Sequence, residues 1–244
     1  MNHDQIGGKI MERISAERST PLILVNEFVR SVYNWMALGL GLTGLVAYYV
    51  SHSPGIMNLI YSNPLLLILL MIGELGLVFA ISGMVNRMSA GTATSLFVIY
   101  SVLNGVTFSF IFLVYTSTSI VSTFFICAGT FVACSIYGWS TKKDLTSLGG
   151  FFMMGLIGII IASLVNMFIR SSAMAMIISY IGVFVFVGLT AYDTQKLKNM
   201  ALTQPAGLDA AVVRKGAILG ALSLYLDFIN LFLMLLRIFG QGRD

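Results

Sequence analysis

The sequence predicts an all-α, polytopic membrane protein with seven transmembrane helices. Of its 244 residues, 57% are hydrophobic and only 10% are charged, whereas a soluble domain has about 25% charged residues. The mean hydropathy is +0.91. The apolar residues come in runs of roughly 20, which is the length that an α-helix needs to cross about 30 Å of hydrocarbon. A chain of this composition would aggregate in water, so we expect it to lie in a lipid bilayer.

Seven apolar runs mark the predicted spans. They are Val29–Val50, Pro64–Met84, Thr92–Tyr115, Ser119–Ser140, Gly149–Ile169, Ala173–Tyr192 and Gly216–Gly240. The connections are short, and only Asp193–Lys215, which contains Pro205 and Gly207, is predicted to form a long polar loop. The chain therefore divides into a polar N-terminal segment, residues 1–28, and one transmembrane domain, residues 29–240.

The distribution of basic residues predicts the orientation. With the N-terminus inside, eleven of the fourteen lysines and arginines lie in cytoplasmic segments and three lie outside. The three are Arg170, Arg237 and Arg243. Because positive charge is enriched in cytoplasmic loops, this bias predicts a cytoplasmic N-terminus and, with seven spans, an external C-terminus. A last run that only re-entered the membrane would leave the C-terminus cytoplasmic as well.

Composition also argues against several kinds of site. The net charge of +4 is scattered over loops, which fits attraction to anionic lipid and gives no nucleic-acid footprint. His3 and His52 both lie outside the apolar runs, so we expect no histidine metal site and no serine–histidine or cysteine–histidine pair within the membrane. Cys127 and Cys134 are seven residues apart in one run, about 10.5 Å along a helix and too far for a disulfide.

Acidic residues within the spans are the candidate functional residues, because a charge in hydrocarbon is costly and normally faces protein or water. Asp227 lies eleven residues into the last run, and Ser223 and Asn230 share its helix face at spacings of four and three. This polar stripe is predicted to face the interior of the bundle. The alternative is a neutral, hydrogen-bonded structural aspartate.

Two further acids are candidates. Asp193 ends the sixth run, just before Lys196 and Lys198, and is either a site residue or a solvated interfacial one. Glu74 lies near the middle of the second run. We expect it either to line a polar cavity or to be a protonated acid bonded to a neighbouring helix.

The last run contains Leu-Ser-Leu-Tyr-Leu-Asp-Phe-Ile-Asn-Leu-Phe-Leu over Leu222–Leu233, the sixth ends in Ala-Tyr-Asp-Thr-Gln over Ala191–Gln195, and Lys-Lys-Asp-Leu spans Lys142–Leu145. In these motifs and in its layout of spans, the chain resembles the bacterial branch of the Bax inhibitor-1-like (transmembrane Bax inhibitor motif) family. The resemblance covers the chain after its first 27 residues. It implies a bacterial inner-membrane protein in which six helices surround a central C-terminal helix.

The resemblance also implies a function. It suggests a pH-sensitive calcium leak gated by two aspartates that share a proton, and these match Asp193 and Asp227 here. It further suggests an arginine near the pair, for which Arg87 is the nearest candidate. Calcium would be the permeant ion, with the two aspartates as its candidate ligands. The expected partners are then the lipid bilayer, calcium ions and protons, with no tightly bound cofactor and no catalytic residue.

Two other functions stay open. Two aspartates that share a proton are also the chemistry of an aspartyl protease, although bulky Leu224, Tyr225 and Leu226 precede Asp227. The sequence also does not exclude a non-conducting regulator of other membrane proteins. If Lys196 and Lys215 mark one membrane boundary, helix rise places Asp193 about 4.5 Å deep and Asp227 about 18 Å deep, so a direct pair requires tilted or extended helices.

Overall fold

The computed structural model describes residues 3–203, 205 and 207–243, with side chains from residue 25 onward. The helices are α1 (His3–Ser51), α2 (Pro54–Tyr61), α3 (Pro64–Met84), η1 (Val85–Arg87), α4 (Ala90–Phe108), α5 (Ile111–Val114), α6 (Ser117–Ser140), α7 (Thr146–Ile169), α8 (Ser172–Thr203) and α9 (Ala210–Phe239). Over these residues the only β-structure is an isolated bridge between Tyr115 and Gly242. The prediction of an all-α fold is confirmed.

Six helical segments of the described chain are long and apolar enough to cross a membrane. They are Pro64–Arg87, Ala90–Val114, Ser117–Ser140, Thr146–Ile169, Ser172–Thr203 and Ala210–Phe239. The remaining predicted run, Val29–Val50, lies within α1, which packs along α4 and α9. The protein is therefore polytopic, and the seventh crossing stays a prediction. Residues 1–2 of the predicted N-terminal segment lie outside the described residues, and α1 begins at His3.

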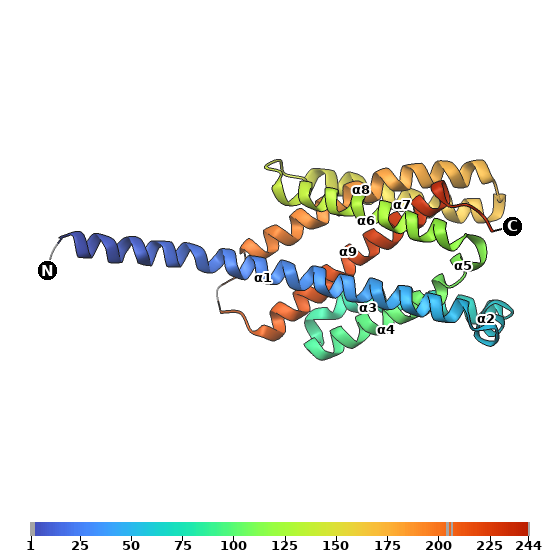
Figure 1. Ribbon diagram of the computed structural model, residues 1–244, viewed down its shortest axis with the longest axis horizontal. Helices are drawn as coiled ribbons and strands as arrows, with labels where there is room; N and C mark the ends of the chain where they lie inside the picture. Colours follow the sequence, from blue (N-terminus) through green and yellow to red (C-terminus); the bar gives the residue numbers. More distant parts are fainter. Residues whose placement is uncertain (1–2, 204, 206, 244) are drawn as a thin grey trace.

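The last helix, α9, lies at the centre of the bundle. It packs against α1, α3, α4, α6 and α8, while α7 packs mainly on α8 (Figure 1). In its apolar stretch 67% of the residues are buried, against 6% in the stretch of α3 that faces outward. A helix that is apolar nearly all round is stable only inside other helices, and the sequence of α9 meets this condition.

Local signals explain where the helices begin. Pro54 and Pro64 occupy the first turns of α2 and α3, where no backbone N–H is needed. The side chains of Asn63, Ser89 and Thr116 accept hydrogen bonds from backbone N–H groups of the first turns of α3, α4 and α6. These caps fix the short connections that return the chain to the bundle.

The predicted run Thr92–Tyr115 corresponds to the segment Ala90–Val114, within which the chain turns between α4 and α5 at Ser109, whose hydroxyl donates to the Val106 carbonyl at 2.7 Å. One predicted boundary is wrong. The expected loop Asp193–Lys215 is mostly helical, since α8 continues to Thr203 and α9 starts at Ala210. Leu197 and Ala201, four residues apart, are buried in the extension of α8, so an apolar stripe continues the helix beyond its hydrophobic run.

The ends of α9 show that it traverses the bundle. Near its start the ammonium group of Lys215 lies 3.4 Å from the Asn86 carbonyl oxygen, beside η1. After its end, the Gln241 carbonyl accepts from the N–H of Thr116 at 3.1 Å and the Arg243 N–H donates to Val114 at 2.9 Å. The N-terminal and C-terminal ends of α9 therefore lie at opposite ends of the bundle (Figure 1). A re-entrant last segment does not fit this path.

A glycine permits the closest approach of α6 to α8. A Cβ atom at Gly138 would overlap the carbonyl oxygen of Ala191, two residues before Asp193. Small residues of this kind let membrane helices approach until their backbones touch. Gly138 therefore helps to fix the position of the segment of α8 that contains Asp193.

We predict that Gly138→Ala lowers thermal stability, because α6 and α8 must separate to admit the methyl group. Overpacking of this kind costs about 1–3 kcal/mol. Gly129→Ala on the same helix is the matched control, since a Cβ there meets no atom within 4 Å. Thermal unfolding of the detergent-purified variants measures the difference. Equal melting temperatures for the two variants would contradict this account of the α6–α8 contact.

Candidate functional site

Asp227 is the buried acid of the central helix. It is 5% exposed, and its neighbours Leu224, Tyr225 and Phe228 are buried as well. Its Oδ2 atom is buried and has no hydrogen-bond partner within the described part of the chain. A charged carboxylate without such partners costs several kcal/mol in an apolar interior. Its protonation state must therefore depend strongly on whatever acid or base lies beside it.

Asp193 on α8 is that neighbour. The two helices are antiparallel: Gly220 on α9 faces Leu197 on α8, and Gly182 on α8 faces Met234 on α9. In this register Asp193 lies level with position 224, three residues or about 4.5 Å along the axis from Asp227. The structure thus places the two predicted acids on facing helices, about one turn apart along the bundle, and no hydrogen bond joins them among the described residues.

The register also explains the difference from the depths expected with Lys196 and Lys215 at one membrane boundary. In the observed pairing Lys215 lies level with about residue 201, well beyond Lys196. Both helices extend past the predicted boundary. The last helix therefore enters the bundle from farther out, and Asp227 reaches nearly the level of Asp193.

Lys196 supplies the positive charge near the pair. Its charge acts on both Asp193 and Asp227, and its ammonium group lies 6.0 Å from the centre of the Tyr192 ring. The sequence contained a signal for this role, since positions three apart share a helix face. Arg87 is exposed in η1, next to Asn86 and thus near Lys215, twelve residues before Asp227 along α9. The structure does not bring Arg87 to the pair.

The three residues of the predicted polar stripe of α9 are buried to different degrees. Ser223 and Asn230 are only half-buried, and the Asn230 amide donates to the carbonyl of Leu226 on its own helix at 2.8 Å. Of the three residues of the stripe, Asp227 is the most enclosed, and the prediction that the whole stripe faces the interior stays a prediction.

Glu74 forms a separate polar contact. It is half-buried on α3, and the hydroxyl of Thr107 on α4 donates to its Oε1 at 2.5 Å. Its charge acts on Tyr100 and Tyr225, in the part of the bundle where α3, α4 and α9 meet. The structure does not place Glu74 with the aspartate pair; Glu74 bonds to a neighbouring helix, and both its protonation and its role in lining a polar cavity stay predictions.

The residues around Asp193 fix its position. The hydroxyl of Thr194 is 3.4 Å from those of Tyr33 on α1 and Ser135 on α6. Gln195 holds the connection between α6 and α7, because its Oε1 accepts from the Leu145 N–H at 2.8 Å and its Nε2 donates to the Lys143 carbonyl at 2.8 Å. The Tyr-Asp-Thr-Gln motif thus ties α8 to three neighbouring elements.

The same connection contains Asp144. The hydroxyl and the N–H of Thr146 donate to its Oδ1 at 2.6 and 2.9 Å. The hydroxyl, followed by the N–H, lowers the pKa of the Asp144 carboxyl. The Lys-Lys-Asp-Leu motif therefore forms a structured loop. Gln195 of α8 bonds to its backbone, and Thr146, the next residue in the chain, bonds to the Asp144 carboxyl.

The described side chains provide no group of three or more histidine, cysteine, aspartate or glutamate residues arranged to hold a metal ion. Two aspartates offer at most four carboxylate oxygens, whereas Ca²⁺ takes six to eight oxygen ligands. Asp193 and Asp227 alone therefore do not complete a calcium-binding shell, and any ion at this point would keep water or backbone ligands.

An all-helical membrane bundle with acids on its two C-terminal helices defines a class of protein, and comparison identifies it. The family model described as "Inhibitor of apoptosis-promoting Bax1" matches residues 25–244. The chain belongs to this Bax inhibitor-1-like family.

Its relatives include named bacterial membrane proteins. The chain is 54% identical over 216 residues to inner membrane protein YbhL of Escherichia coli strain K12, covering 88% of this chain and 92% of that protein. An uncharacterized protein of Borreliella burgdorferi is 47% identical over 224 residues, covering 91% and 95%. An uncharacterized membrane protein of Streptococcus pyogenes is 39% identical over 220 residues, covering 89% and 94%.

We predict that Gln195→Leu speeds cleavage by trypsin at the exposed Lys142 and Lys143, because both hydrogen bonds to that loop are lost and the buried Leu145 N–H remains unpaired. Such losses cost about 1–3 kcal/mol each. The rate of tryptic cleavage at this loop, in protein held in detergent, measures the effect. Asn199→Leu, exposed one turn further along α8, should be cleaved at the wild-type rate. Unchanged cleavage in Gln195→Leu would show that the contact does not hold the loop.

Proposed function

We propose that the protein is a pH-sensitive calcium leak of the bacterial inner membrane, gated by the pair Asp193 and Asp227. The supporting observation is the position of Asp227: buried in the central helix, with an unpaired Oδ2 and a second acid one turn away. Two carboxylates this close in a poorly solvated site do not both ionise cheaply. The pair then shares one proton, and its titration belongs to both residues.

The proton is the latch in this proposal. In the singly protonated state an O–H···O⁻ hydrogen bond links α8 to α9. Adding a second proton, or removing the last one, breaks that bond and shifts the population between two arrangements of the central helix. Lys196, whose charge reaches both acids, sets the pH range in which this happens. Calcium would bind only weakly along its path, which conduction requires.

The alternative of an intramembrane aspartyl protease would use the same two acids. Asp227 lies within an unbroken helix from Ala210 to Phe239, and the residues next to Asp227 are bulky and buried. A peptide substrate needs an extended backbone beside both carboxyls, so this packing favours the leak over the protease. Glu74, whose carboxyl accepts from Thr107 of α4, is a candidate for lining an ion path away from the pair.

We predict a pH-dependent calcium flux in liposomes that contain only this protein. Asp193→Asn and Asp227→Asn should each flatten the pH response, and the double variant should add little, because either change alone ends proton sharing. Asp209→Asn is the control: Asp209 is an exposed N-cap of α9, and asparagine caps as well as aspartate. A dye trapped in the liposomes reports the flux.

Three outcomes would contradict the proposal. Wild-type liposomes without calcium flux would remove the leak. A wild-type pH profile of the flux in either single variant would contradict the proton-sharing mechanism. Additive effects of the two substitutions on that profile would contradict it as well. The control variant separates these results from a general sensitivity to lost acidic charge.

We also propose that the N-terminus is cytoplasmic and the C-terminus external. The end of the bundle that contains Arg87, Lys143, Lys198 and Lys215 is rich in basic residues, and the C-terminal tail lies at the other end. Fusions of a periplasm-dependent reporter after Arg243 should be active, and fusions within 196–214 should be inactive. Activity of the internal fusion, or a silent C-terminal fusion that is expressed, would reverse the orientation.

A further inference from the structure

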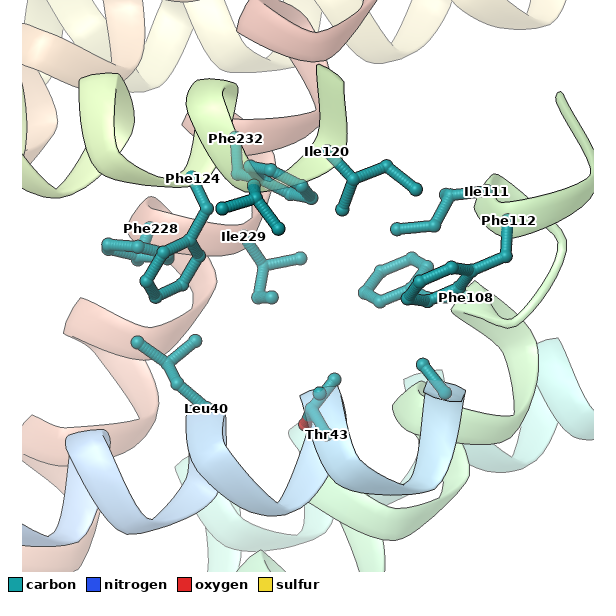
Figure 2. A pocket seen from close by; sticks show the side chains of 13 residues that line it. Leu40, Thr43, Phe108, Ile111, Phe112, Ile120, Phe124, Phe228, Ile229 and Phe232 are labelled. Carbon is teal, nitrogen blue, oxygen red and sulfur yellow. The ribbon is translucent and has the colours of Figure 1, made fainter. Parts of the chain in front are cut away.

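A second feature of the bundle lies apart from the aspartate pair. Side chains of α1, α4, α5, α6 and α9 surround a cavity of about 180 Å³ (Figure 2). Leu40 and Thr43 of α1 form one wall, Ile120 and Phe124 of α6 form the opposite wall, and Phe228 of α9 lies beside Phe124. The cavity therefore reaches from between α1 and α6 to the central helix.

The lining of the cavity is apolar. Its one side-chain hydroxyl, that of Thr43, donates to the Ser101 carbonyl at 2.8 Å and lies 2.7 Å from the Tyr225 hydroxyl. A hydroxyl engaged twice in this way offers little to a ligand. Cavities of about 150 Å³ with such walls stay dry and take up apolar molecules. An occupant would therefore be held by dispersion and apolar contact, without hydrogen bonds.

The cavity also lies at the depth of lipid tails. Thr43 is eight residues from the end of α1, Phe124 seven from the start of α6, and Phe232 seven from the end of α9. These counts place it about 10–12 Å below the helix ends, within the hydrocarbon layer and below the headgroups. Its edge is open to that layer, because the lining residues Val121 and Phe124 are 54% and 41% exposed.

We propose that this cavity binds one hydrocarbon chain of a membrane lipid, inserted between α1 and α6 against Phe228, Ile229 and Phe232 of the central helix. The depth, the open edge and the engaged hydroxyl together favour a lipid tail over a headgroup or a water-soluble ligand. The chain would contact α9 at the residue next to Asp227. This site does not depend on calcium conduction.

Photolabelling in liposomes tests the site. The probe is a phospholipid with a photoreactive diazirine at the end of one acyl chain, and labelled positions are mapped by mass spectrometry. Lipid-facing helices such as α3 should be labelled in any case. Phe228, Ile229 and Phe232 are at most 8% exposed, so label there requires entry through the cavity. A probe with the diazirine in its headgroup should leave these three residues unlabelled.

Matched variants make the test specific. Gly44 lines the cavity, and a Cβ there meets no atom within 4 Å, so Gly44→Phe should fill the space and abolish label on residues 228–232. Gly41→Phe is the control, since Gly41 is equally open and lies outside the lining. Val121→Trp blocks the opposite wall, with Val132→Trp as its control, because these valines are 54% and 55% exposed.

The results decide the proposal in either direction. Loss of the label on 228–232 in both filled variants, with its retention in both controls, supports a chain-binding cavity. An unlabelled α9 in the wild-type protein, with α3 labelled in the same sample, would overturn it. Label on 228–232 that persists in Gly44→Phe and Val121→Trp would also overturn it, as would equal labelling of these residues by the headgroup probe.

Discussion

The burial of a carboxyl group in the central helix of a membrane bundle is the constraint on which the site depends. Asp227 is 5% exposed and its Oδ2 has no partner among the described residues. In hydrocarbon such a group is tolerated only where protein or water surrounds it. Its protein neighbours must therefore replace the solvation that water provides elsewhere, and Asp193 and Lys196 on the facing helix α8 are the charged residues that act on it. The position of α8 relative to α9 consequently decides how Asp227 behaves.

That position is fixed from several sides at once. Gly138 lets α6 touch the backbone of α8, and Gly220 on α9 lies against Leu197 on α8. Gln195 bonds to the loop between α6 and α7, while Thr194 meets Tyr33 of α1. A small displacement of α8 would disturb all of these contacts together. The Tyr-Asp-Thr-Gln motif is therefore best understood as a single device that places one acid opposite another.

Much of the fold and the identity of the two acids followed from the sequence, because hydropathy and the cost of charge in lipid act residue by residue. The range predicted for Pro64–Met84 coincides with α3. Features that depend on tertiary contacts were missed. The extension of α8 rests on Leu197 and Ala201 packing against neighbours, and the level of Asp227 rests on the α8–α9 register. Neither is visible in hydropathy.

The basic residues near the acids show the same difference between what the sequence predicts and what packing decides. Only the family resemblance suggests Arg87 as the basic partner of the pair. Lys196 instead lies on the same helix face as Asp193, and its charge acts on both acids. The apolar cavity was also beyond the sequence, because five separate elements line it. A sequence pattern identifies which residues are unusual in their segment, and packing determines which of them meet.

The most direct test of the account is an infrared titration of carboxyl groups in the reconstituted protein. Glu74→Gln serves as the background, so that signals from protonated carboxyls within the bundle come from the pair. The account predicts one protonated carboxyl from the pair at neutral pH, with a titration that changes in both Asp193→Asn and Asp227→Asn. If the titration of Asp227 is the same with and without Asp193, the two acids do not share a proton and the central claim is wrong.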